Sequence, residues 1–285
     1  MPDSRKPAGT WAAWALVLIL LAAAYWPVVG YLIKNWWIDP NYSHGFLVPL
    51  VTAWLLWSRR QGLAQAAGRP SPWGLVVVGL GLVLLILGRW GHELFLQRIS
   101  LVPVLWGLVL TAWGWPVARA TLFPFAYLFF MIPLPYLIYD ALAFPLRLVA
   151  ASLAGDLLRL WGLPVLVEGN IIHLPRNVLD VVDACSGIRS LVSLLAAAVI
   201  MVYLWLSRFW SRALVVMLVP PVAILTNSLR VVIAGILAEN YGPSMLEGAT
   251  HDLVGWLVFL AAFGLILVIT LVLGRLEGRG REKTT

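Results

Sequence analysis

The sequence predicts an all-α polytopic membrane protein with about eight transmembrane helices, and three observations carry this prediction. Hydrophobic residues make up 61% of the 285-residue chain and charged residues 12%, which is about half the charged fraction of soluble domains. Apolar runs of about 20 residues, each able to cross the hydrocarbon core as a helix, recur along the whole length. Trp and Tyr gather near the ends of these runs, where interfacial aromatic residues belong. We therefore expect a single integral membrane domain over residues 1–285.

Hydropathy divides the chain into eight expected spans. The first begins at Trp11 and is too long for the apolar core of a cleaved signal peptide, so we expect it to be retained. Proline occurs inside some spans, which membrane helices tolerate when neighbouring groups satisfy the freed backbone. The expected spans are residues 11–33, 44–58, 73–88, 99–115, 119–139, 187–206, 212–235 and 252–273.

Residues 140–186, between the fifth and sixth spans, have a different pattern. A-F-P-L-R-L-V-A-A-S-L-A-G-D-L-L-R-L-W is amphipathic at helical spacing, because Arg147 and Arg159 interrupt an apolar surface. We expect this helix to lie in the membrane interface rather than to cross it. The next segments, V-L-V-E-G-N-I-I-H-L and N-V-L-D-V-V-D, are β-branched runs around Gly169-Asn170, which predicts a small β-hairpin.

The distribution of charge predicts the orientation. With the N-terminus inside, the cytoplasmic segments carry 12 of the 20 Lys and Arg residues, in agreement with the positive-inside rule. The net charge of +7 is then a topology signal, so we exclude nucleic acid as a partner and expect contact with membrane lipid. Both termini are expected in the cytoplasm, and the 140–186 insertion on the outer side.

This topology brings three chemically distinctive residues to the outer leaflet. Cys185, the only cysteine of the chain, comes at the outer end of the sixth span. Arg230 lies near the outer end of the seventh span, and His251 lies at the outer start of the eighth. A shared pocket could run acyl transfer: a thiolate attacks a carbonyl, an imidazole protonates the leaving amine, and a fixed cation stabilises the oxyanion.

Each of these residues also has a plainer interpretation. A lone buried cysteine packs as a small hydrophobic residue, and an interfacial histidine often forms surface hydrogen bonds. Arg230 could extend to the headgroups, although an ionisable residue inside a span is costly and points to function. The spacing alone leaves both interpretations open.

Five further residues are candidates for support of the pocket. Arg189, four residues after Cys185, would favour the thiolate together with the helix N-terminus at Gly187, whereas Asp183 would oppose it. His44, in N-Y-S-H-G-F, could support the pocket or cap the second span. The five are Asp183, Arg189, Asn227, Asp252 and His44. A single cysteine excludes a thiolate-rich metal cluster, and no metal or cofactor is expected.

Four segments resemble the signatures of the exosortase/archaeosortase family, in the family's order. They are N-Y-S-H-G-F-L-V-P-L, D-A-C-S-G-I-R-S-L, N-S-L-R-V and H-D-L-V-G-W, and the resemblance covers residues 40 to 270. It implies a periplasm-facing cysteine transpeptidase of the Gram-negative inner membrane, with Cys185 as nucleophile and Arg230 and His251 as its catalytic partners. The implied substrates carry a C-terminal PEP-CTERM signal: a Pro-Glu-Pro motif, a membrane helix and a basic tail. Such enzymes are associated with exopolysaccharide gene clusters.

Three other functions are alternatives to a cysteine transpeptidase. A transporter usually shows internal repeats and ionisable groups near the midplane, and the sequence shows no repeat. A serine protease using Ser186 or Ser190 would leave the cysteine unused. A non-catalytic component of exopolysaccharide export would tolerate Cys185→Ala. The sequence does not identify the acceptor nucleophile, so transpeptidation and hydrolysis both stay open.

Overall fold

A computed structural model describes residues 8–181, 188–242, 244 and 248–282, without the side chains of 8–11, 249, 251 and 279–282. The chain forms two compact units, Met1–Leu134 and Pro135–Thr285, and each is described by itself. The expectation of a single membrane domain over residues 1–285 stays a prediction.

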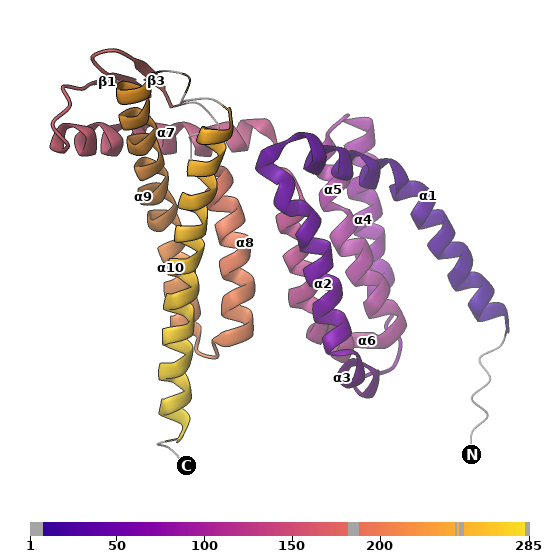
Figure 1. Cartoon of the computed structure of the whole chain (residues 1–285). Helices are drawn as coiled ribbons and strands as arrows, with labels where there is room; N and C mark the ends of the chain where they lie inside the picture. Colours follow the sequence, from indigo (N-terminus) through magenta and orange to yellow (C-terminus); the bar gives the residue numbers. More distant parts are fainter. Residues whose placement is uncertain (1–7, 182–187, 243, 245–247, 283–285) are drawn as a thin grey trace. The chain divides into compact units, whose positions relative to one another are not determined.

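The first unit consists of helices with short connections (Figure 1). Its elements are α1 (Ala8–Ile38), the 3-10 helix η1 (Pro40–Phe46), α2 (Leu47–Ser58), α3 (Arg60–Gln65), α4 (Trp73–Trp90), α5 (Leu94–Ile99), α6 (Leu101–Tyr127) and the 3-10 helix η2 (Leu128–Met131).

Helix α6 turns back on itself at Gly114, whose φ of 76° lies in the left-handed region. The indole of Trp106 donates a hydrogen bond to the carbonyl of Ala118 at 2.8 Å. In a straight helix these two residues would be about 18 Å apart along the axis, so the chain must reverse between them. A side chain at Gly114 would also collide with the carbonyl oxygen of Arg69. The expected spans 99–115 and 119–139 therefore correspond to the two arms of α6.

The second arm of α6 ends earlier than the sequence predicts. The expected span runs to residue 139, but the helix ends at Tyr127 and η2 ends at Met131. The next residues are I-P-L-P, and proline disfavours helical backbone at the residue before it. Pro135 then precedes the first residue of the next helix, α7, which belongs to the second unit.

The second unit combines four helices with a small sheet. Its elements are α7 (Tyr136–Leu160), β1 (Leu166–Glu168), β2 (Ile171–His173), β3 (Val178–Asp180), α8 (Ile188–Trp205), α9 (Phe209–Tyr241) and α10 (Gly248–Glu282). The sheet is antiparallel with strand order β1-β2-β3. The hairpin expected around Gly169-Asn170 is thus confirmed as β1–β2, and β3 extends it.

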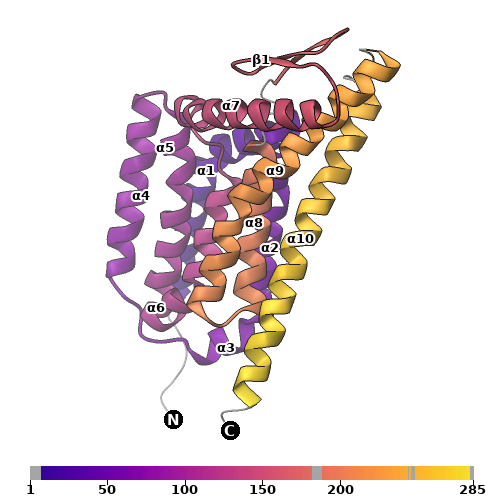
Figure 2. The ribbon, with the colours of Figure 1, turned by 90° about the vertical axis from the view of Figure 1, so that its left-hand side faces the viewer.

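Helix α7 lies across the long helices of its unit. In both views it runs transversely past α9 near that helix's C-terminal end, while α8, α9 and α10 run roughly parallel to one another (Figures 1 and 2). This is the arrangement expected of a helix in the membrane interface. The sheet lies on the far side of α7 from the main length of α8 (Figure 2).

The sheet is attached to α7 and α9 by a buried apolar cluster. Small side chains on α7 let the sheet approach closely, and a side chain at Gly155 would collide with Val167 of β1. The buried members of the cluster are Ala150, Ala151, Ala154 and Leu158 of α7, Ile172, Leu174, Leu179 and Val181 of the sheet region, and Val231 and Val232 of α9.

Seven helical segments of the described chain are long and apolar enough to cross a membrane. They include the 38-residue segment Leu94–Met131, which contains the reversal at Gly114. They also include α7, which lies across its unit, and they leave out the 12-residue helix α2. The count differs from the expected eight for these reasons, and the all-α polytopic membrane architecture is confirmed.

Candidate active site

The candidate site lies at one end of the second unit, where five elements meet. The C-terminal part of α9, the first turns of α8 and α10, the helix α7 and the sheet all occupy this end (Figure 1). The predicted residues Arg230, Arg189 and His251 belong to α9, α8 and α10. The chain topology therefore brings the predicted positions from consecutive helices to one end of one unit.

Arg230 contacts the helix that carries His251. Its guanidinium lies so close to Gly255 that a β-carbon built there would be 2.9 Å from Arg230 Cζ and Nη2. Position 251 is four residues before Gly255, the spacing that places two residues on one face of an α-helix. The guanidinium thus lies about one helical turn from position 251, because four residues rise about 6 Å along the axis. The side chain of His251 itself lies outside the described residues.

The predicted nucleophile Cys185 and its neighbour Asp183 also lie outside the described residues. The residues that flank this segment are well packed: Val181 is 2% exposed and Ile188 is 1% exposed. Val181 belongs to the same buried cluster as Val231, the residue after Arg230. The last described residue after β3, Val181, therefore packs in the same cluster as the turn of α9 that carries Arg230.

The predicted supporting residues differ in burial. Asn227 is 4% exposed and lies one turn before Arg230 on α9. This burial agrees with the prediction that both residues lie on the same face of the helix. Arg189 is half-buried in the first turn of α8, whereas Asp252 is exposed on α10. Of these three, Asn227 is best placed to orient a group beside Arg230.

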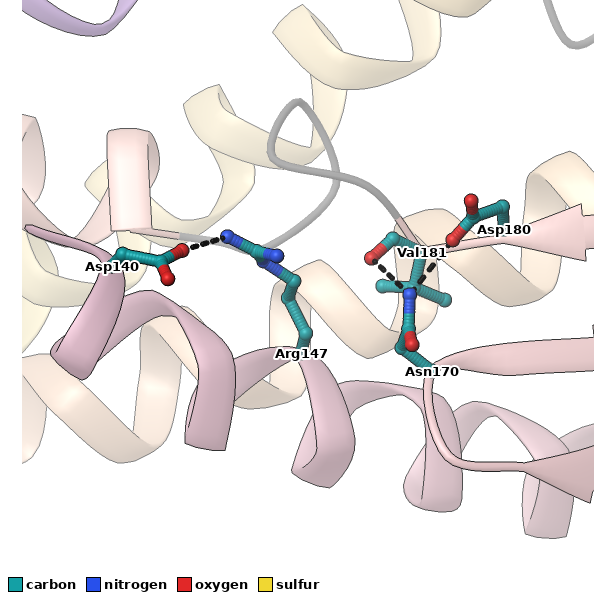
Figure 3. A network of polar contacts seen from close by, with 5 residues as sticks. All are labelled: Asp140, Arg147, Asn170, Asp180 and Val181. Carbon is teal, nitrogen blue, oxygen red and sulfur yellow. Dashed lines mark hydrogen bonds and ion pairs between the residues drawn. The ribbon is translucent and has the colours of Figure 1, made fainter.

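Polar contacts that the sequence did not predict occur within α7 and within the sheet, two elements at this end of the unit. Arg147 of α7 forms an ion pair with Asp140 at 2.8 Å, and its side chain is 16% exposed. The Nδ2 of Asn170 donates to Asp180 Oδ1 at 2.7 Å, across the end of the sheet (Figure 3). Arg147, a basic residue on the apolar face of α7, was the sequence signal for the ion pair. For Asn170 the sequence had no signal beyond its position in a turn.

His44 belongs to the first unit, where it has a structural role. Its Nε2 donates to the carbonyl of Phe130 at 3.1 Å. Trp36 Nε1 donates to the carbonyl of Met131 at 2.8 Å, and the backbone N–H of Leu134 donates to the hydroxyl of Tyr42 at 3.2 Å. We call these three side chains the clasp, because together they hold the backbone of residues 130–134. Burial lowers the pKa of His44 below its ordinary value, which favours the neutral ring.

No group of three or more His, Cys, Asp or Glu side chains that could hold a metal ion occurs among the described residues. Within that part of the chain, the polar groups near the candidate site include the half-buried guanidinium groups of Arg230 and Arg189 and the buried amide of Asn227. A guanidinium of this kind can stabilise a developing oxyanion or a thiolate.

Comparison with known families agrees with this architecture. A family model described as transmembrane exosortase matches residues 36–268. The match includes η1, most of each unit and the positions of Cys185, Arg230 and His251. No curated protein and no solved structure gives a match.

Proposed function

The chain belongs to the transmembrane exosortase family, and from this premise we propose that it is a cysteine transpeptidase that cleaves PEP-CTERM sorting signals. The reaction takes place at the periplasmic face of the bacterial inner membrane, with both termini of the enzyme in the cytoplasm. Its substrates are exported proteins whose C-terminal helix and basic tail dock in the same membrane. The sorting of these proteins accompanies exopolysaccharide production.

The observation that carries this proposal is the packing of the Arg230 guanidinium against Gly255, one turn from position 251. Arg230, a costly ionisable residue, thus lies beside the helix that carries His251, the candidate general acid. Its neighbour Val231 shares a buried cluster with Val181, four residues before Cys185. These contacts support the assignment of Arg230, His251 and Cys185 to acyl transfer.

The chemistry proceeds in two steps. The Cys185 thiolate attacks the carbonyl carbon of the scissile peptide bond, and the electron pair moves onto the carbonyl oxygen, where Arg230 stabilises the negative charge. The C–N bond then breaks, and the departing amine takes a proton from His251. This leaves the substrate as a thioester on Cys185.

A second nucleophile resolves the thioester. An amine or hydroxyl acceptor, or water, attacks the thioester carbonyl, and neutral His251 accepts the proton that this nucleophile loses. The C–S bond breaks and the Cys185 thiolate is regenerated. An acceptor amine or hydroxyl gives transpeptidation, and water gives hydrolysis.

Co-expression with a reporter tests this function. The reporter ends in a Pro-Glu-Pro motif, an apolar helix and a basic tail, and its size is followed by immunoblot. We expect a shorter or modified reporter with the wild type, none with Cys185→Ala, and mass spectrometry of the new C-terminus identifies the acceptor. A reporter that stays intact with a well-expressed wild type, or is processed equally by Cys185→Ala, would contradict the proposal.

A further inference from the structure

The outer edge of strand β3 has a defined pattern of backbone groups that point away from the sheet. At the two ends of the β2–β3 ladder, Val181 N–H donates to the carbonyl of Asn170 at 2.9 Å and Leu174 N–H donates to that of Asn177 at 2.8 Å. Hydrogen-bonded pairs alternate with non-bonded pairs in an antiparallel ladder. With Val178 opposite His173, the backbone N–H and C=O of Val178 therefore point away from β2.

The same alternation applies to Asp180, which lies opposite Ile171. The backbone groups of Val178 and Asp180 thus form a row along the outer edge of β3, and they make no hydrogen bond with any described residue. Val178 is 59% exposed, so solvent reaches this row. An exposed row of this kind is a template for pairing with another extended chain.

Strand β3 is held firmly at both ends. Asn170 Nδ2 donates to the carboxylate of Asp180 at 2.7 Å, so this charge is bound back onto the sheet (Figure 3). At the other end, Asn177 Nδ2 donates to the carbonyl of Ala238, at the end of α9, at 3.1 Å. Between them, Leu179 is buried in the cluster shared with α7 and α9. An edge fixed in this way loses little entropy when a partner strand binds.

The β3 edge is also the sheet edge nearest to the candidate nucleophile along the chain. Cys185 is five positions after Asp180, a distance of at most about 17 Å along an extended chain. On strand β1, the opposite edge, the outward backbone groups are those of Val167 alone, because Leu166 and Glu168 face β2. The β3 edge therefore offers the longer row, next to the proposed chemistry.

We propose that the outer edge of β3 binds an extended segment of the polypeptide substrate as a fourth strand. This inference rests on the proposed function, since a peptidase must hold a substrate backbone extended at its nucleophile. Strand addition binds the main chain and tolerates different side chains. The edge thereby fixes the register of the substrate, while its C-terminal helix lies in the membrane.

The variant Val178→Pro tests this edge with Val178→Ala as its matched control. Proline removes the outward N–H without touching the β2–β3 bonds, a position where edge strands accept it. Binding of a labelled peptide with the Pro-Glu-Pro motif is measured on the Cys185→Ala background, so the assay does not depend on catalysis. We expect proline to weaken binding about three- to tenfold relative to alanine, the loss of one hydrogen bond. Equal binding by the two variants would overturn the proposal.

An N-methyl scan of the peptide tests the same edge without changing the protein fold. Pairing of strands predicts that N-methyl groups weaken binding at every second residue of the peptide, because alternate N–H groups face β3. A flat profile, or one without a two-residue period, would overturn the proposal even if Val178→Pro fails to fold. If the peptide binds with this period but is never cleaved by the wild type, the proposed reaction is wrong and the docking edge stands.

Discussion

At the residue scale, the contact between Arg230 and Gly255 brings the predicted arginine to the helix that carries position 251. The sequence predicted Arg230 and His251 from their place at the outer ends of two spans, because topology alone brings such ends together. It did not predict Gly255, since a glycine in an apolar helix has many explanations. The reason for this glycine is spatial: a β-carbon would lie 2.9 Å from the guanidinium.

The variant Gly255→Ala is expected to lower activity while leaving the fold intact. The new methyl group displaces a flexible guanidinium rather than backbone, and alanine raises helix propensity by up to about 1 kcal/mol. Reporter processing and the melting temperature measure the two effects. Gly264→Ala on the same helix is the control, because nothing lies within 4 Å of that position. Equal activity of the two variants would show that Arg230 has no catalytic role.

The positive charge of Arg230 should lower the pKa of the Cys185 thiol, and this effect can be measured. Because the chain has a single cysteine, the rate of its alkylation by iodoacetamide reports this thiol alone, and the pH dependence of the rate gives its pKa. We expect Arg230→Gln to raise that pKa and to reduce processing about 10²- to 10³-fold, as for loss of an oxyanion partner. Arg230→Lys should recover part of both. An unchanged alkylation profile with full processing would contradict the assignment.

At the scale of the elements, hydropathy predicts where helices occur but not how they turn. The expected spans 99–115 and 119–139 are the two arms of one hairpin, and the positive φ of Gly114 makes the reversal. The transverse course of α7 fits the interfacial helix that its amphipathic pattern predicts. Its start at Tyr136 was not predicted, because I-P-L-P was placed within a span. The run N-V-L-D-V-V-D predicted β structure, but its pattern did not separate a third strand from the hairpin.

The variant Gly114→Ala should destabilise the first unit by at least about 2 kcal/mol. Alanine is strained at a φ of 76°, and its methyl group would collide with the carbonyl of Arg69. Thermal unfolding in detergent measures the loss. Gly79→Ala in α4, where nothing lies within 4 Å, is expected to unfold at or above the wild-type temperature; similar melting of both variants would argue against the tight reversal.

A buried carboxylate fixes the opposite end of the second unit. Glu277 of α10 is 8% exposed, and its Oε2 accepts the backbone N–H of Ser207 at 2.7 Å and that of Arg208 at 3.2 Å. Glu277→Ala would leave both donors without this acceptor, so we expect a loss of about 1.5–3 kcal/mol in the free energy of unfolding. Glu277→Gln should lose less, because one amide oxygen can still accept; an alanine variant as stable as the wild type would refute this.

At the scale of the whole molecule, the clasp in the first unit gives the tyrosine and histidine side chains of N-Y-S-H-G-F a structural role. The sequence left His44 between support of the pocket and a helix cap. The structure gives it a contact with Phe130, beside the contacts of Trp36 and Tyr42 with the following backbone. These contacts hold the residues that lead along the chain into α7. A clasp formed over about 90 positions of sequence cannot be read from local pattern.

The clasp predicts that stability depends on pH. Because the pKa of His44 is lowered in the folded protein, the unfolded chain binds the proton more tightly. Stability is therefore full above the unfolded value of about 6.5 and is lost as pH falls below it, through the folded pKa. Melting temperatures measured from pH 8 to pH 5 should fall less for His44→Gln than for the wild type. Parallel curves would show that this ring does not couple protonation to folding.

Trapping the thioester that we propose between Cys185 and the substrate tests the reaction at its covalent step. The enzyme is purified with its reporter under denaturing conditions, digested, and searched by mass spectrometry for a cross-linked peptide. We predict an adduct on the peptide containing Cys185, released by neutral hydroxylamine and absent in Cys185→Ala. Processing that continues without an adduct, or an adduct on Ser186 or Ser190, would contradict the account.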